Sequence, residues 1–139
     1  MSYVAKTAKV LDYAQVRDNA QVSDNAMVSG TSKVFGDAMV FGDAVVGGNA
    51  YVDGNANVYD NAHVSGNAIV IGKAVVWNDA EVYDDARIAG RAWVFGKAWV
   101  FGYAQVGGTA RVYGSSLLEG DVTISSGSIT DIHWWKDIP

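Results

Sequence analysis

Residues 52–70 read VDGNANVYDNAHVSGNAIV, a stretch that places valine at every sixth position. The same step extends outward from Val4 to Ile124, and all 21 positions on it are Val, Ile or Leu. A second series lies four residues after each aliphatic position. Between positions 8 and 110 it comprises 17 alanines and one serine, Ser32. The repeating unit is therefore V-x-[GD]-[ND]-A-x, with no insertion from Val4 to Ile124.

This period excludes a helix and favours short strands separated by tight turns. A helical period of 3.6 residues would spread the valines around the whole helix. A β-branched residue suits a position in a strand that points inward, and the alanine fits a corner where only a small side chain has room. The dipeptides between them, such as Asp18-Asn19 and Gly36-Asp37, tolerate positive φ or hydrogen-bond to their own turn.

Length and composition narrow the class of protein. The chain has 139 residues, enough for one domain, of which 50% are hydrophobic. The absence of cysteine excludes a disulfide scaffold, a cysteine-ligated metal site and a cysteine nucleophile. A net charge of −5 argues against generic binding to nucleic acid. We find no apolar run long enough for a membrane span and no secretory signal, and so expect no membrane partner and a cytoplasmic location.

The aliphatic residue followed four positions later by a small one resembles the bacterial hexapeptide-repeat family, an acyltransferase-like superfamily, over positions 4 to about 126. The resemblance implies an all-β, single-domain, left-handed parallel β-helix in which three hexapeptides form one triangular coil. The chain would then contain about seven coils. The period alone also permits a right-handed solenoid.

The repeat weakens near its end, which divides the chain into a β-helix over 1–126 and a C-terminal segment over 127–139. A solenoid needs a cap because its last coil exposes apolar core and unpaired strand edges. We therefore interpret Ile132, Trp134 and Trp135 as a lid on that end, or as an arm that packs on a neighbouring subunit.

If residues 18 apart stack, each face of the coil can be read as columns of outward side chains. The face built on Val22, Val40 and their successors carries a broad apolar patch, which consists of Met39, Phe41, Tyr59, Val75, Trp77, Trp93, Phe95 and Tyr113. The adjacent face adds Tyr83, Trp99 and Phe101. Aromatic residues after the aliphatic position depart from the family, which usually has small or polar residues there.

Three interpretations of these aromatic residues stay open. The rings can stack on one another and stiffen the sheet. The patch can be the interface of a homo-oligomer, a dimer or a trimer. It can also bind a ligand, for example sugar rings stacked on Trp77 and Trp93.

The resemblance implies an enzymatic alternative. Many hexapeptide-repeat proteins transfer acyl groups from acetyl-CoA or an acyl carrier protein at an active site between subunits, with histidine as general base. The chain has two histidines, His63 and His133. His63 is expected on an outward position next to Glu81, which would orient its ring as a base requires. The alternative is an ordinary exposed polar side chain, and the family's protruding loop and CoA pocket are not evident.

Metal chemistry is not expected. The resemblance to γ-type carbonic anhydrases fails because that family binds zinc through three histidines. This chain has only two, which lie far apart in the sequence. Corner Asp and Asn residues alternate with Lys73, Arg91 and Lys97 at equivalent positions, so turn geometry explains them better than calcium binding.

Together these observations favour a non-catalytic β-helix scaffold or protein-binding module that self-associates, or binds a macromolecular partner, through its aromatic face. No cofactor is expected. The alternative is a small acyltransferase that uses acetyl-CoA or CoA at an intersubunit site. A third hypothesis is an acidic, inhibitor-like protein that occupies a basic site on its partner.

Overall fold

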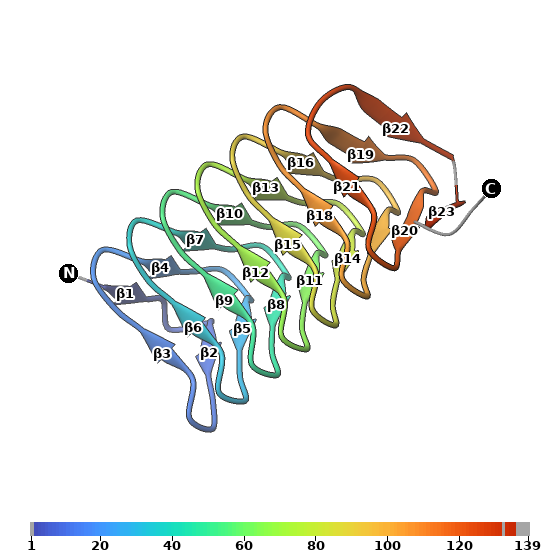
Figure 1. The fold of residues 1–139 in the computed structure, drawn as a ribbon. Coiled ribbons are helices and arrows are strands. Elements are labelled where there is room, and N and C mark those ends of the chain that lie inside the picture. Colours follow the sequence, from blue (N-terminus) through green and yellow to red (C-terminus); the bar gives the residue numbers. More distant parts are fainter. Residues whose placement is uncertain (1, 132, 136–139) are drawn as a thin grey trace.

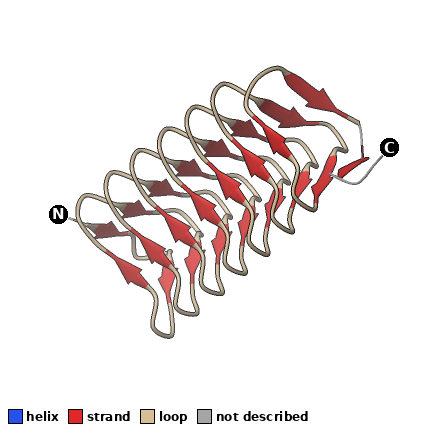
Figure 2. Cartoon of the chain, in the orientation of Figure 1, coloured by secondary structure: helices blue, strands red, loops and turns tan. Residues whose placement is uncertain are grey.

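A computed structural model describes residues 2–131 and 133–135, and within them all regular structure is β-strand (Figure 2). Most strands contain two residues, the second of which is the aliphatic residue of the repeat. Tight turns separate them. From β1 (Tyr3–Val4) to β21 (Thr123–Ile124) the strands recur with the six-residue step, as the sequence predicts.

The strands form three parallel sheets. Sheet A consists of β1 (Tyr3–Val4), β4 (Gln21–Val22), β7 (Met39–Val40), β10 (Asn57–Val58), β13 (Val75–Val76), β16 (Trp93–Val94), β19 (Arg111–Tyr113) and β22 (Ser128–Thr130). Sheet B consists of β2 (Lys9–Val10), β5 (Met27–Val28), β8 (Val45–Val46), β11 (His63–Val64), β14 (Glu81–Val82), β17 (Trp99–Val100), β20 (Leu117–Glu119) and β23 (His133–Trp135). Sheet C consists of β3 (Gln15–Val16), β6 (Lys33–Val34), β9 (Tyr51–Val52), β12 (Ile69–Val70), β15 (Arg87–Ile88), β18 (Gln105–Val106) and β21 (Thr123–Ile124).

Successive coils stack so that each residue lies beside its equivalent three repeats later. Val58 on β10 pairs with Val40 on one side and Val76 on the other. The chain is therefore a parallel β-solenoid of about seven coils, with strands β1 and β22 at opposite ends of sheet A (Figure 1). This confirms the predicted architecture, whereas its left hand stays an expectation from the family resemblance.

The core contains two kinds of side chain. From Ala20 onward, the aliphatic and alanine columns are almost completely withdrawn from solvent, and the aliphatic residues from Val22 to Val100 are 0% exposed. Burial of apolar surface drives this packing. Between coils, backbone amides donate along the axis, as Phe41 N does to Val58 O at 3.0 Å. Apolar burial and backbone pairing therefore repeat together in every coil.

The corners adopt the left-handed conformation that the sequence suggests. The first corner position has positive φ, as at Asp18 (60°) and Gly36 (65°). The Asp18 carboxylate accepts a hydrogen bond of 3.1 Å from the Gly36 backbone N–H in the next coil. Aspartate therefore offsets the strain of positive φ by a bond between coils, whereas glycine avoids most of the strain.

Serine replaces alanine in the buried corner column at Ser32 and Ser116. Both are essentially unexposed, at 0% and 1%. Each hydroxyl donates to the carbonyl three residues earlier, Ser32 to Ser29 O at 2.6 Å and Ser116 to Tyr113 O at 2.7 Å. A small polar residue is tolerated in this column because its own turn accepts its hydrogen bond.

The two ends differ. At the N-terminal end Val4 remains 42% exposed, because no coil covers it within the described chain. At the other end β22 pairs with β19 and β23 pairs with β20, so the C-terminal segment extends two of the sheets. The register shortens there, because Arg111 pairs with Ser128 and no longer with the residue three full repeats later. Ile129 packs against the core.

The predicted cap is described only in part. Trp134 and Trp135 belong to β23 by their backbone. Their side chains and all of Ile132 lie outside the described residues, so their role as a lid or an arm stays a prediction.

Candidate functional site

Five aromatic rings form a continuous stack on the outside of sheet A, and we call them the aromatic ladder. The ladder consists of Phe41, Tyr59, Trp77, Phe95 and Tyr113. Successive ring centroids are 4.7, 5.9, 4.3 and 4.9 Å apart, with interplanar angles of 3 to 8°. Equivalent residues lie one above the other in adjacent coils, about 4.8 Å apart, which matches the spacing of stacked rings. The rings therefore contact one another, as the stacking interpretation expects.

A second outward column runs beside the ladder and is more exposed. It contains Met39, which is 38% exposed, and Trp93, which is 37% exposed. The guanidinium of Arg111 lies 4.3 Å from the centroid of the Trp93 ring, a cation–π contact. Trp93 also meets the edge of Trp77 at 5.5 Å between centroids. The predicted patch residues are thus brought together, with the ladder and Val75 half-buried and Met39 and Trp93 exposed.

The outer face of sheet A is unusual in its charge. We define it as the two outward columns between β4 and β19, which are Gln21, Ser23, Met39, Phe41, Asn57, Tyr59, Val75, Trp77, Trp93, Phe95, Arg111 and Tyr113. These columns contain no carboxylate and one formal charge, that of Arg111, although the chain has 15 acidic residues. Acidic side chains are thus confined to other parts of the surface.

Sheet B carries the second predicted aromatic group. Tyr83 and Phe101 stack with centroids 4.8 Å apart and an interplanar angle of 1°. Trp99 behaves differently, because it is 43% exposed and its indole stacks on no ring of the described side chains. The second face therefore combines a paired stack with one unengaged tryptophan.

Burial in these stacks changes the ionisation of two tyrosines. Burial raises the pKa of Tyr59 above its ordinary value of 10.0, and the nearby Asp60 carboxylate adds to the effect. The pKa of Tyr83 is raised in the same way, first by burial and then by Asp84, Glu81 and Glu119. Both phenols therefore stay neutral over a wider pH range than in a free chain.

The proposed catalytic pair lies in adjacent strands. His63 on β11 and Glu81 on β14 are register partners, as predicted, with Val45 on the other side of the histidine. His63 is exposed and Glu81 is half-buried. Within the described residues no hydrogen bond joins the imidazole to the carboxylate. The two residues are neighbours, but the geometry does not hold the ring in one orientation.

Hydrogen bonds between coils join the polar corner side chains. Asn61 Nδ2 donates to Asp79 Oδ1 at 3.3 Å, and Asn67 Nδ2 donates to Asp85 Oδ1 at 3.2 Å. Among the side chains of residues 2–131, no group of three or more His, Cys, Asp or Glu is placed to hold a metal ion. In the same part of the chain, no helix has the length and hydropathy to span a membrane.

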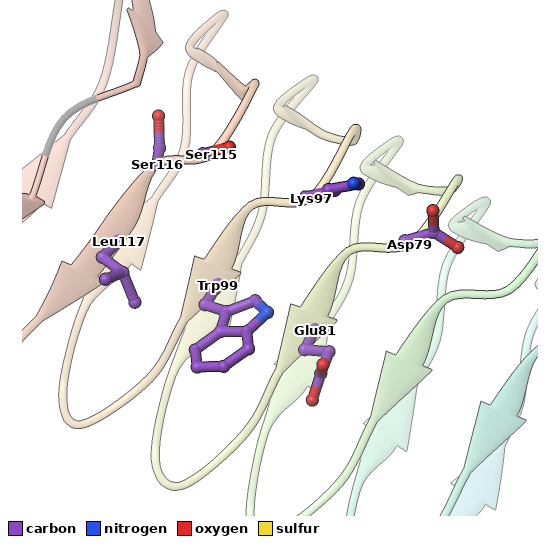
Figure 3. A pocket seen from close by; sticks show the side chains of 7 residues that line it. All are labelled: Asp79, Glu81, Lys97, Trp99, Ser115, Ser116 and Leu117. Atoms are coloured by element: carbon purple, nitrogen blue, oxygen red, sulfur yellow. The ribbon is translucent and has the colours of Figure 1, made fainter.

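A groove beside sheet B was not predicted from the sequence. It is an open hollow of about 430 Å³ where the turns after sheet A meet strands β14, β17 and β20. Figure 3 shows the indole of Trp99 between the side chains of Glu81 and Leu117 on these three strands. The lining residues are Asp79, Glu81, Lys97, Trp99, Ser115, Ser116 and Leu117. Residues 79, 97 and 115 recur at one corner, and residues 81, 99 and 117 recur on the adjoining strands. A comparison of these two series in the sequence would have indicated the groove.

Comparison with known proteins supports the fold and defines the class of protein. The family model described as YdcK Beta solenoid repeat matches residues 20–32 and 33–48. No curated protein and no solved structure matches the chain. The matched segments cover β4 to β8, in the regular part of the repeat. The chain is thus a repeat protein of the parallel β-solenoid class, similar over these segments to the YdcK repeat.

Proposed function

We propose that the protein is a non-catalytic scaffold that self-associates through the outer face of sheet A. The observation that carries this proposal is the concentration of aromatic side chains on a face without carboxylates. Interface cores are depleted in charged residues and enriched in Trp, Tyr, Phe, Met and Arg. The outer face of sheet A has this composition, whereas the whole chain carries a net charge of −5.

The two columns that would meet in such an interface contain no carboxylate, and Asp60 lies at their edge next to Tyr59. In a two-fold arrangement the same surface serves both partners. If the strands of the two copies run in opposite directions along the face, Arg111 of each copy lies near the Gln21 end of the other. The ladder is already held by stacking within the chain, so association would order few additional side chains and lose little entropy.

The size of the face predicts weak association. From β4 to β19 it spans five coil spacings, or about 24 Å at about 4.8 Å per coil. A strip of this length and one strand in width is smaller than a standard protein–protein interface. We therefore expect the oligomer, a dimer or a trimer, to depend on protein concentration.

The test is the molar mass in solution, measured by light scattering on a sizing column over a hundredfold range of concentration. The variant Met39→Ser with Trp93→Ser removes the two exposed apolar side chains of the face and keeps all five ladder residues, with loss of the Trp93 contacts to Trp77 and Phe95. We expect the wild type to rise above the monomer mass and this variant to stay monomeric. The matched control is Ile71→Ser, which changes a residue of similar exposure, 36%, beside sheet C.

A wild type that stays monomeric throughout would overturn self-association. In that case the face of sheet A would be free for a macromolecular partner. The acidic, inhibitor-like alternative would then be tested by its salt dependence, because attraction between an acidic protein and a basic site weakens as ionic strength rises.

A second candidate function rests on the His63 and Glu81 neighbours. It is a hexapeptide-type acyltransferase with left-handed winding, which uses acetyl-CoA or CoA at a site between subunits and His63 as base. A ligand that binds only the folded protein must stabilise it, so CoA should raise the melting temperature. Any acetyl transfer should be lost in His63→Ala. Activity that persists in this variant would remove His63 from the proposal.

A further inference from the structure

We infer that the groove around Trp99 binds the guanidinium group of an arginine side chain presented by a partner protein. The groove lies beside sheet B, on a different face from the proposed self-association surface. The inference therefore does not depend on self-association. It rests on an open indole, an available carboxylate and the charge of the lining.

Trp99 is the open indole. Its side chain is 43% exposed and lines the groove. On sheet A the corresponding arrangement is already filled, because Arg111 lies one coil after Trp93 with its guanidinium 4.3 Å from the ring centroid. On sheet B the residue one coil after Trp99 is Leu117, which supplies no cation. The indole is therefore left for a guanidinium from outside the chain.

Glu81 is the available carboxylate. It is the register partner of Trp99 on the opposite side from Leu117. Its carboxylate accepts no hydrogen bond from the described residues. A planar guanidinium that stacks on the indole can direct two N–H groups toward a neighbouring carboxylate, which is the geometry that arginine favours over lysine.

The remaining charges do not oppose such a ligand. Asp79 and Lys97 occupy the same corner position in successive coils, so opposite charges lie about one coil spacing apart. Together with Glu81 they give the lining a net formal charge of −1. A single positive group would therefore neutralise the charge of the groove. An anion would instead add to its negative charge.

The volume suits one side chain rather than a large cofactor. About 430 Å³ is near the lower end of small-molecule sites. Leu117 provides an apolar wall against which the methylene groups of an arginine can pack. Ser115 at the adjoining turn offers a hydroxyl to the backbone of the incoming segment.

The experiment follows the indole N–H signal of Trp99 by two-dimensional NMR, with the signal identified by its loss in Trp99→Phe. The probe is an acetyl-Gly-Arg-Gly-amide peptide at millimolar concentration. Its matched control replaces arginine by citrulline, which has nearly the same shape but no charge. We expect the arginine peptide to shift the Trp99 signal and to bind about tenfold or more tightly than the citrulline peptide, a difference of about 1.4 kcal/mol.

Two variants assign the effect to the groove. Glu81→Gln keeps the shape of the side chain and removes its charge, and we expect it to weaken arginine-peptide binding at least about tenfold. Ile71→Ser changes an exposed apolar residue beside sheet C, outside both proposed surfaces, and should leave the affinity for the arginine peptide unchanged. Thermal melts establish that both variants are folded.

Several results would overturn the inference. Equal binding of the citrulline peptide would mean that the groove does not recognise charge. Binding of methyl glucoside with no response to the arginine peptide would make it a saccharide site. Binding of free arginine alone would exclude a protein partner. No shift with any of these probes, or unchanged peptide binding in Glu81→Gln, would also remove the proposed site.

Discussion

The indole of Trp77 lies parallel to the ring of Phe95, with centroids 4.3 Å apart and planes 6° apart. The two residues are separated by three repeats in the chain and by one coil in space. Trp77 also stacks on Tyr59, at 5.9 Å. A single side chain therefore couples three successive coils on the outside of the solenoid.

Removal of this ring should destabilise the protein. In Trp77→Ala two stacking contacts and part of the apolar burial are lost, so we expect the free energy of unfolding to fall by about 1–3 kcal/mol. Trp77→Phe keeps a flat ring and should lose less than about 1 kcal/mol. Urea denaturation measures both. A Trp77→Ala variant as stable as the wild type would show that the ladder does not stabilise the fold.

The alanine column allows a sharp test of the core. Ala62 is 0% exposed, and Ala62→Leu should cost about 1–3 kcal/mol because the corner has no room for three further carbons. Ala62→Ser should stay within about 1 kcal/mol of the wild type, since its hydroxyl can donate to Tyr59 O, as Ser32 and Ser116 do in the same column. Thermal and urea unfolding give the comparison. A tolerated leucine would contradict the proposed packing.

A corner glycine provides a test of backbone strain. Gly72 has a φ of +72°, and a Cβ there would lie 2.9 Å from Gly90 O in the next coil. Gly72→Val should cost at least about 1–2 kcal/mol. Gly72→Asp should be milder, because Asp18 occupies the equivalent corner and accepts a bond from the next coil. Equal melting temperatures of Gly72→Val and Gly72→Asp would show that the hydrogen bond between coils does not compensate for the backbone strain.

The half-buried phenols of Tyr59 and Tyr83 predict a loss of stability at high pH. Burial raises the pKa values of Tyr59 and Tyr83 in the folded protein above the ordinary value of 10.0. Their neutral forms fit the fold, so this contribution is fully present below pH about 10 and is lost as the pH rises through the folded-state pKa values. The melting temperature should therefore fall as the pH rises above about 10, and by less in Tyr59→Phe with Tyr83→Phe. An identical fall in that variant would assign the loss to other groups.

The register was predictable because the same packing problem recurs in each coil. In every repeat the valine packs into the core from a strand, the corner residue has positive φ and the alanine packs into the core at the corner. The structure of one repeat therefore predicts that of its neighbours. Ser32 illustrates why a single exception does not disturb the pattern. Its size fits the alanine position and its turn accepts its hydroxyl.

The groove and the tail were not predictable in the same way. Trp99, Glu81 and Leu117 are separately ordinary outward residues, and their hollow exists only because side chains of different length meet over three coils. In the tail the aliphatic step is lost, so the pairing of Leu117 with His133 has no counterpart in the regular register. The juxtaposition of His63 and Glu81 was predicted correctly, but adjacency alone does not assign chemistry.

The uniform coil also restricts how the length of such a chain can change. Insertion or deletion of three complete repeats adds or removes one coil and returns every later side chain to its own sheet. A change of one repeat preserves the buried positions but transfers every later residue to the next sheet, which would interrupt the aromatic ladder. A change that is not a whole number of repeats places polar residues in the core. Length variants of this protein that remain folded should therefore differ by a whole number of repeats. Those that also keep each outward residue on its own sheet should differ by a whole number of coils.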